Sequence, residues 1–268
     1  MAEKEYSFGF IGCGNMGGTL AAAVAASGTG SLAIADHSVE KAESAAKRLG
    51  ADVLSNEEIF ARCKMIFLGV KPQVLPSVLE DAARHTAGGR HVLVSMAAGV
   101  AIKSIEAYVG EDTPIIRIMP NTPAAVGAGT VLYCKNDAAT DADVAAFTAA
   151  MAPAGSLCPL PEGLIDAGCA LTGCGPAFVY MFIEALADGG VRCGLPRDLA
   201  ADFAAQVVYG SAKTAMESEC HTAQLKDAVC SPGGSTIAGV EALERAAFRA
   251  AAMDAVTAAF ERTKELGK

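Results

Sequence analysis

The chain has 268 residues with 30 acidic and 21 basic side chains, a formal net charge of −9 at pH 7. This acidic balance, with no basic run interleaved with aromatic residues, argues against a nucleic-acid partner. No apolar stretch is long enough to cross a membrane without a charge, and the first residues are polar. We therefore expect a cytoplasmic protein with no membrane partner and no secretory signal.

Cysteine and histidine spacing gives no sign of a metal site. The nine cysteines are irregularly spaced without a Cys-x-x-Cys pair, and the four histidines are scattered. Structural zinc sites need closely spaced ligand pairs, and an odd number of cysteines does not fit a disulfide framework. We expect reduced thiols and no bound metal.

The first part of the chain alternates short apolar runs with helical patterns. Such alternation predicts βαβ units and a mainly parallel sheet. The expected strands cover residues 8–11, 32–35, 65–68, 92–95, 115–118 and 131–133. A proline-rich segment at residues 159–163 ends the pattern, so we place a dinucleotide-binding domain over residues 1–160 and a helical domain over residues 161–268.

A glycine-rich turn follows the first predicted strand. Gly12, Gly14 and Gly17 form a Gly-x-Gly-x-x-Gly pattern that opens a helical run over residues 19–26. The first glycine permits the tight turn, the second lets a pyrophosphate approach the backbone, and the third allows close packing of helix and strand. This context predicts a Rossmann-type site for NAD(P)H that also includes Asn15 and Met16.

The second strand ends at Asp36, where a carboxylate can accept hydrogen bonds from the adenosine ribose. Because a carboxylate repels a 2′-phosphate, Asp36 favours NADH over NADPH. The neighbouring His37, Ser38 and Lys41 are able to receive a phosphate, which leaves both cofactors open, and an Asp that only caps the next helix is the alternative interpretation.

Further loops are expected at the same edge of the sheet. Ligands in open parallel sheets bind outside the carboxyl ends of the strands. The stiff loop around Asn121, held by two prolines, is suited to positioning a nicotinamide ring. Lys71 either neutralises an anion or is solvated. The other residues expected to line this cleft are Asn56, Val70, Pro72 and Ala97.

The second domain is predicted to contain only helices. Prolines at 176 and 196 open helices expected to run to residues 188 and about 217, the first ended by Gly189 and Gly190. A third helical stretch covers residues 236–266 with a break near Ala246. Residues 177–187 are apolar almost all round, which predicts an oligomer interface; a central helix wrapped by its own chain is the alternative.

The turn at residues 231–236 carries the substrate prediction. Pro232 ends the preceding element, two glycines let the backbone turn, and Ser235 or Thr236 can cap the next helix. Such a turn presents backbone N–H groups to an anion, with a hydroxyl beside them. The turn predicts either a small-carboxylate site or a helix cap alone.

These residues resemble the pyrroline-5-carboxylate reductase family along essentially the whole chain. The similar segments, in the family's order, are residues 10–17, 70–72, 117–123, 184–190, 194–197, 224–227 and 231–236. The resemblance implies reduction of the cyclic imine carboxylate 1-pyrroline-5-carboxylate to L-proline, the last step of proline biosynthesis. It also implies a Rossmann-type domain followed by an all-α dimerisation domain, in homodimers or larger rings of dimers.

The resemblance also implies roles for individual residues. The backbone of Gly234, Ser235 and Thr236 would hold the substrate carboxylate, Thr236 would lie by the imine nitrogen, and Glu219 would lie near the substrate. An imine accepts hydride well only when it is protonated or strongly hydrogen-bonded, so a donor at nitrogen is required. Threonine is a poor acid, and we expect Thr236 to orient the imine rather than to donate a proton.

Two positions depart from the family pattern. Cys174 stands where the family often has serine, and Ala228 where a family Asn can touch the cofactor.

Two other functions remain open. A β-hydroxyacid dehydrogenase carries a catalytic Lys where this chain has Val179, and a valine cannot exchange protons with an alcohol. The other is a non-catalytic nicotinamide-binding sensor.

Overall fold

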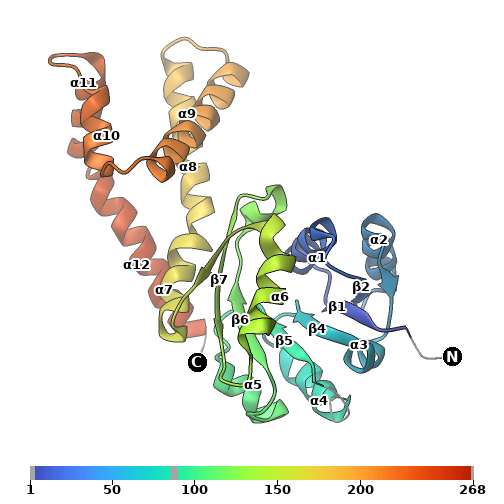
Figure 1. Ribbon diagram of the computed structural model, residues 1–268. Coiled ribbons are helices and arrows are strands. Elements are labelled where there is room, and N and C mark those ends of the chain that lie inside the picture. Colours follow the sequence, from blue (N-terminus) through green and yellow to red (C-terminus); the bar gives the residue numbers. More distant parts are fainter. Residues whose placement is uncertain (1–3, 86–89, 267–268) are drawn as a thin grey trace. The chain divides into compact units, whose positions relative to one another are not determined.

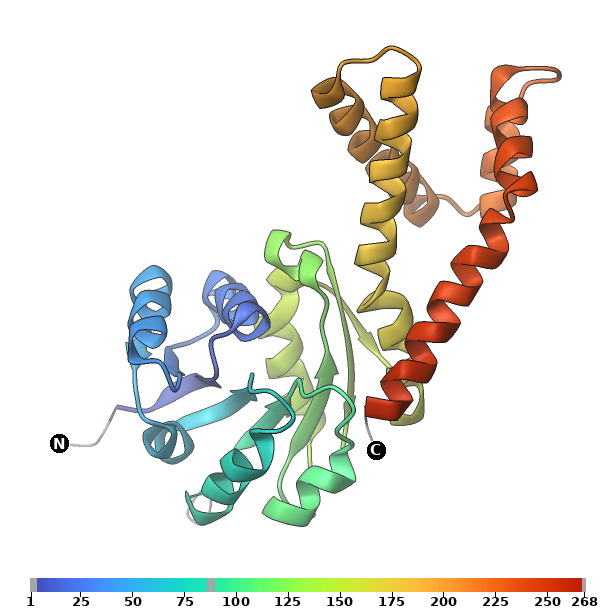
Figure 2. The same cartoon turned by 180° about the vertical axis from the view of Figure 1, so that it is seen from behind.

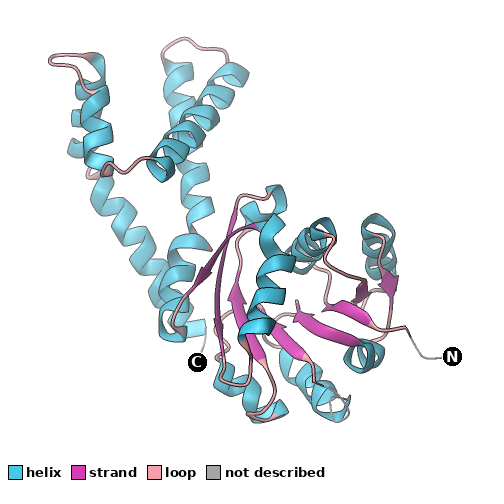
Figure 3. Ribbon diagram, viewed as in Figure 1, coloured by secondary structure: helices cyan, strands magenta, loops and turns pink. Residues whose placement is uncertain are grey.

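The computed structural model of the protein describes residues 4–85 and 90–266. The chain forms two compact units, one running to Cys174 and including the segment from Ala259 onward, the other spanning Gly175–Ala258. The first contains every strand and the second is helical (Figures 1 and 3). The predicted fold class, a Rossmann-type domain followed by an all-α domain, is confirmed.

The first unit is built on an eight-stranded sheet with the order β3-β2-β1-β4-β5-β6-β7-β8. All neighbours pair in parallel except β6 and β7, which are antiparallel. The order reverses between β1 and β4, where an open α/β sheet binds its ligands. The strands are β1 (Tyr6–Ile11), β2 (Leu32–Ala35), β3 (Asp52–Val53), β4 (Cys63–Leu68), β5 (Val92–Ser95), β6 (Ile115–Met119), β7 (Gly129–Lys135) and β8 (Gly155–Pro159).

Helices cover both faces of this sheet (Figure 2). Residues of α1, α2 and α6 pack against one face, where the rings of Phe10 and Phe67 stack at 4.3 Å. Residues of α3, α4, α5 and α7 pack against the other face. The helices are α1 (Asn15–Ser27), α2 (Val39–Leu49), α3 (Asn56–Arg62), α4 (Leu75–His85), α5 (Ile102–Val109), α6 (Asp141–Met151) and α7 (Glu162–Thr172), with short 3-10 turns η1 (Thr122–Val126) and η2 (Ala152–Ala154).

Six of the eight strands match the predicted ones. β3 was not predicted because its two residues are exposed and form no apolar run. The edge strand β8 was also missed, since its side chains are half-buried or exposed and include a serine and a proline. Strands without a buried apolar face lack the sequence pattern by which strands are recognised.

Helix α7 packs with the sheet, although the sequence places the domain boundary between residues 160 and 161. Arg117 on β6 is 3% exposed, and its guanidinium lies 3.2 Å from Glu162 and 2.9 Å from Asp166. Ile165 of α7 is fully buried in the core that also contains residues of α3, α4 and α5. These contacts extend the first unit to Cys174.

The second unit contains α8 (Gly175–Arg192), α9 (Arg197–Glu217), α10 (Thr222–Val229), α11 (Ser235–Arg245) and the first part of α12 (Phe248–Leu266). Pro196 precedes α9 as predicted. The expected break near Ala246 is confirmed: α11 ends at Arg245, and Ala247 has a φ of 56° before α12 begins.

The predicted end of α8 at Gly189 and Gly190 is wrong, because the helix continues to Arg192. At Gly190 a Cβ would lie 3.3 Å from the Cβ of Ala200 on α9. The absence of a side chain at Gly190 therefore lets α8 and α9 approach closely. The chain leaves α8 at Gly194, whose φ of 102° suits glycine.

The buried core of the second unit is small. It consists of Ala187, Ala200 and Ala204, with Ile183 and Val191 packed against them. Large side chains on α8 and α9 are exposed, including Met181 at 69% and Phe203 at 55%. Among the described residues, one helical span, Glu162–Arg192, is by length and composition apolar enough to cross a membrane, a test that the core helix of a soluble protein also passes.

Candidate functional site

The glycine-rich turn leaves β1 at the point where the strand order reverses. Gly12 has a φ of 95°, and a Cβ there would lie 2.7 Å from the carbonyl oxygen of Gly69, which follows β4. A Cβ at Gly17 would overlap the carbonyl oxygen of Gly12. Gly14 has open space around it. Gly12 therefore makes the tight turn and Gly17 allows the helix to pack closely, while the space around Gly14 is compatible with the ligand approach predicted there.

Free backbone donors gather at the start of α1. The N–H groups of Gly14, Asn15 and Met16 have no acceptor among the described residues. The first N–H groups of a helix carry partial positive charge and bind phosphate groups. A cavity of about 570 Å³ lies beside this turn, and Cys13, Gly14 and Asn15 line it. The residues present therefore fit the pyrophosphate of a dinucleotide.

Cys13, within the glycine turn, is half-buried. Burial, with a smaller effect of the Asp36 carboxylate, raises the pKa of its thiol to about 12. The thiol therefore stays protonated at neutral pH and is a poor nucleophile. Cys13 is best understood as a packing residue of the turn, and it contacts the core beneath α1 and α2.

The carboxylate of Asp36 accepts hydrogen bonds from two backbone N–H groups of the protein. Its side chain is 5% exposed; Oδ2 accepts a hydrogen bond from Cys13 N (2.7 Å) and Oδ1 accepts one from Ser38 N (2.9 Å). His37 Nδ1 lies 2.9 Å from Oδ1. Burial alone would raise the pKa of Asp36, but the hydrogen bonds from Ser38 and Cys13 lower it overall, so the group stays ionised.

Two cations near the same turn include one that the sequence analysis missed. Lys41 and Arg48 both line the cavity beside Gly14, and neither forms an ion pair with a described residue. They stand seven positions apart on α2 and so share one face of the helix. This spacing was readable in the sequence, but only the packing of α2 beside α1 brings Arg48 to the turn.

The remaining predicted residues follow the carboxyl ends of the other strands. Asn56 begins α3 directly after the β3 segment, and Ala97 follows β5. Val70, Lys71 and Pro72 follow β4, and Lys71 is exposed. Since the neighbouring strands β3, β2, β1, β4 and β5 are parallel, these residues lie along one edge of the sheet.

Asn121 has a different environment from the predicted one. Its side chain is buried, with Nδ2 donating to Thr172 O (3.0 Å) and Oδ1 accepting from Thr130 N (2.8 Å). The amide therefore ties the loop after β6 to α7 and β7. A contact between this loop and a nicotinamide ring would have to come from its backbone or from the exposed Thr122.

In the second unit, the turn at residues 231–236 has the tight backbone that the predicted anion nest requires. Gly233 has a φ of 69°, and Gly234 is the N-cap of α11 without a side-chain capping bond. The predicted capping by Ser235 or Thr236 is therefore wrong, because both residues lie inside the first turn of the helix. Their N–H groups have no acceptor in the described ranges, 4–85 and 90–266.

Gly234 contributes space to this nest. Its N–H already donates to Ser231 O (3.0 Å), and a Cβ would overlap the Ser231 hydroxyl. Glu219 is exposed in the turn between α9 and α10. Ala228 is the penultimate residue of α10, and Cys174 is a half-buried free thiol at the end of the first unit.

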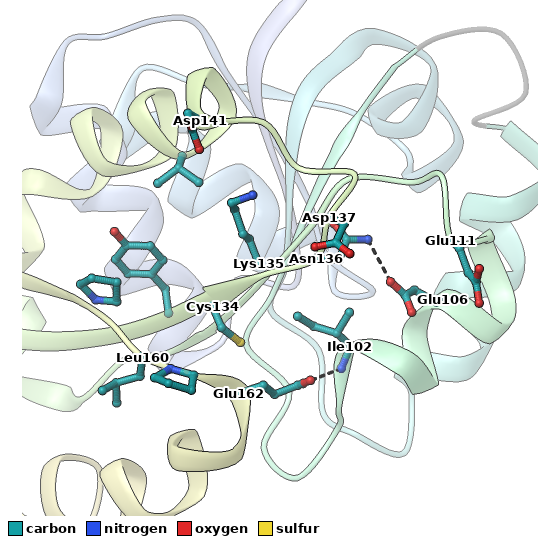
Figure 4. Close-up of a pocket in the computed structure, with 14 residues that line it drawn as sticks. Ile102, Glu106, Glu111, Cys134, Lys135, Asn136, Asp137, Asp141, Leu160 and Glu162 are labelled. Atoms are coloured by element: carbon teal, nitrogen blue, oxygen red, sulfur yellow. Dashed lines mark hydrogen bonds between the residues drawn. The ribbon is translucent and has the colours of Figure 1, made fainter.

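Another cavity, of about 850 Å³, lies elsewhere in the first unit (Figure 4). Carboxylates line it, and two of them are engaged: Glu106 accepts from Asn136 Nδ2 (3.0 Å) and Glu162 accepts from Ile102 N (2.7 Å). None of the residues predicted to bind cofactor or substrate lines this cavity. Across the described ranges, no group of three or more His, Cys, Asp or Glu is arranged to hold a metal.

A Rossmann-type unit with a glycine turn after its first strand, followed by a helical unit, is typical of dinucleotide-dependent oxidoreductases. The family models agree. Residues 7–99 match the model described as NADP oxidoreductase coenzyme F420-dependent, and residues 162–266 match pyrroline-5-carboxylate reductase dimerisation. The chain belongs to the pyrroline-5-carboxylate reductase family, as the similar proteins also show.

A pyrroline-5-carboxylate reductase of Pisum sativum is 40% identical over 98% of this chain and 97% of its own length. The crystal structure of Plasmodium falciparum pyrroline carboxylate reductase with NADP bound is 34% identical, with a TM-score of 0.87 and complete coverage of both chains. The structure of a pyrroline-5-carboxylate reductase from Coxiella burnetii is 29% identical, with a TM-score of 0.91 over 99% of this chain and 100% of that one.

Proposed function

We propose that this chain reduces 1-pyrroline-5-carboxylate to L-proline with NAD(P)H, as the last step of proline biosynthesis. The observation that carries the proposal is the nest at residues 231–236, where two free N–H groups begin α11 beside the Thr236 hydroxyl. When bound, the reduced nicotinamide supplies a hydride to the imine carbon. Membership of the family indicates the substrate class, a cyclic imine carboxylate, that we assign to this nest.

The nest is suited to the substrate carboxylate. The N–H groups of Ser235 and Thr236 supply two donors at the positive end of α11. A side chain at position 234 would overlap the Ser231 hydroxyl, so glycine there lets the turn close, and its own N–H is already bonded to Ser231 O. The nest therefore binds the carboxylate through Ser235 and Thr236, with Gly234 shaping the turn.

Thr236 is placed to act at the imine nitrogen. Its side chain is half-buried in the first turn of α11, next to the two carboxylate donors. A hydroxyl near its ordinary, very weak acidity hydrogen-bonds the imine more readily than it gives up a proton. Thr236 orients an imine that arrives protonated, and the exposed Glu219 supports the positive charge on the substrate.

The dinucleotide lies along the carboxyl edge of the sheet in the first unit. The free amides of Gly14, Asn15 and Met16 would receive its pyrophosphate at the turn made by Gly12, and Val70, Lys71, Pro72 and Ala97 follow the strands toward the nicotinamide end. Asp36, His37, Ser38 and Asn56 stand at the adenosine end. The negative charge of Asp36 disfavours a 2′-phosphate, so NADH is the preferred cofactor.

The active protein is a homodimer, and dimers assemble into a larger ring in the cytoplasm. The support is the exposed apolar surface of α8 and α9, in which only Ala187 among the described residues of α8 is buried. This surface favours another copy of the chain over a bilayer, because the match to the dimerisation model covers the same helices.

The deciding experiment is loss of reduced-nicotinamide absorbance when 1-pyrroline-5-carboxylate is added, measured separately with NADH and NADPH. We expect decay with both and a higher kcat/KM with NADH, with L-proline as the product. Decay with neither cofactor would favour a non-catalytic sensor. Turnover of a hydroxy acid instead would favour the dehydrogenase alternative, although Val179 on α8 has no group for proton exchange.

Asp36→Ala tests the cofactor assignment. The change removes both the ribose acceptor and the charge that repels a 2′-phosphate. We therefore expect the KM for NADH to rise more than the KM for NADPH, as measured by steady-state rates with each cofactor. Equal losses for the two cofactors would contradict a role of Asp36 in choosing between them.

A further inference from the structure

The end of β2 holds two consecutive amides of the glycine turn. Gly12 N donates to Ala35 O (2.8 Å), and the next amide, Cys13 N, donates to the Asp36 carboxylate (2.7 Å). The second bond is to a charged acceptor, which makes it stronger than a bond between neutral groups. The turn is thus fixed from β2 as well as from β1.

The same carboxylate fixes the entry to α2. Its other oxygen accepts from Ser38 N (2.9 Å), and Ser38 is the N-cap of α2, with its hydroxyl accepting from Lys41 N (3.4 Å). Asp36 therefore joins three segments: the end of β2, the glycine turn and the start of α2. With its side chain only 5% exposed, it is part of the framework beneath the cofactor cradle.

With the bond from Cys13, the backbone N–H groups of the turn fall into two sets, those bonded within the protein and those without an acceptor. The amides of Gly12 and Cys13 are bonded within the protein, whereas those of Gly14, Asn15 and Met16 have no acceptor among the described residues. Without the carboxylate, Cys13 N would lose its acceptor and the turn would lose a fixed point directly before Gly14. Donors that are held in place bind an anion without the entropic cost of ordering them.

We propose that Asp36 is a positioning residue for the cofactor pyrophosphate, acting through Cys13 on the glycine turn in addition to any contact with the ribose. This role rests on the proposed use of NAD(P)H. It predicts that losing the carboxylate weakens every dinucleotide, including those with nothing for Asp36 to bind on the ribose. A residue that only recognises the ribose would have no such effect.

The test combines a protein change with a ligand change. Dissociation constants are measured by calorimetry for wild type and Asp36→Ala with NADH and with an NADH analogue whose adenosine ribose lacks both hydroxyls. We expect Asp36→Ala to weaken both ligands by about tenfold, the effect of losing a hydrogen bond to a charged group. If Asp36→Ala bound the analogue with a dissociation constant within about twofold of the wild-type value, the proposal would be overturned.

Two further variants serve as an alternative substitution and as a control. Asp36→Asn replaces the charged acceptor of Cys13 N by a neutral oxygen or an NH2 group, so it should weaken the analogue as well, and it replaces Asp36→Ala in the same test if that variant does not fold. Glu43→Ala removes an exposed acid of α2 and should leave both constants unchanged. Because the readout is binding, failed turnover of the imine would refute the proposed function without affecting this result.

Discussion

The two units of the chain bury their apolar side chains to very different extents. The first has aromatic and aliphatic cores on both faces of its sheet, with Phe10, Phe67 and Phe147 fully buried. The second has three buried alanines and leaves Phe203, Tyr209 and Met216 exposed. The first unit has a large core of its own, whereas the second leaves most of its large apolar side chains exposed, as the proposed pairing with another copy of the chain requires.

This contrast also separates the two anion sites. The glycine turn stands on a rigid sheet, where Gly12, Gly17 and Gly69 pack backbone against backbone. The nest at residues 231–236 stands on helices with little core of their own. If the chain assembles as proposed, we expect assembly to affect the geometry of the turn at residues 231–236 more than that of the glycine turn, which is supported by the sheet of its own unit.

Truncation of the first core should have the largest effect. Phe67→Ala removes a ring that stacks on Phe10, and we expect the free energy of unfolding to fall by about 3–5 kcal/mol. Denaturant titrations followed by circular dichroism should give this loss at both low and high protein concentration. Val39→Ala, at a 64% exposed position, is the control and should change stability little. A loss of unfolding free energy that depended on protein concentration would contradict the conclusion that the first unit has its core within one chain.

Thr236→Ala should come next. Removing the hydroxyl at the nest is expected to lower kcat roughly tenfold to thousandfold, the lower part of the range for proton-handling groups. Thr257→Ala makes the same chemical change at an exposed position of α12 and should leave kcat unchanged. Steady-state rates with saturating cofactor measure both variants. Unchanged turnover in Thr236→Ala would remove this residue from the mechanism.

A charge on the exposed face of α9 should then separate the subunits. Phe203→Glu is expected to weaken dimerisation by about 2 kcal/mol, roughly thirtyfold, because a charge must be buried where an aromatic ring packed. Sedimentation at several concentrations measures this. Val126→Glu places the same charge at an 80% exposed site of the first unit and serves as control. A wild-type chain that sediments as a monomer would refute the interface.

The smallest effect concerns the Asp143 and Arg90 pair on the first unit. The hydrogen bond from Arg90 holds the pKa of Asp143 well below its ordinary value, despite partial burial. A lowered folded-state pKa gives stability that is present above about pH 4 and is lost as the pH falls toward the folded pKa. Asp143→Asn should cost about 1 kcal/mol at pH 7, with the difference from wild type shrinking below about pH 4.

The pair is tested by unfolding both proteins across this pH range. Asp141→Asn is a suitable control, since it removes an exposed carboxylate from the same first turn of α6. A difference between wild type and Asp143→Asn that persisted unchanged at the lowest pH would contradict the assignment.

Much of the fold was predictable because its signals are local. The glycine pattern after β1, the apolar runs of the buried strands and the proline before α9 each act within a few residues. Elements without such signals were missed or misjudged: the exposed β3, the edge strand β8, and the Gly189–Gly190 pair that continues α8. Glycine in a sequence does not distinguish a helix end from a close helix contact.

The sequence alone determined the class of the protein, the order of its two parts and the positions of the two glycine-rich turns, because these depend on backbone freedom and periodicity. Tertiary structure decided which polar groups remain free. It turned the Asp36 carboxylate toward Cys13 and Ser38, placed Asn121 between Thr172 and Thr130, and brought Arg48 beside the glycine turn. The hydrogen-bond partner of a side chain is set by residues distant in sequence, so only the folded chain reveals it.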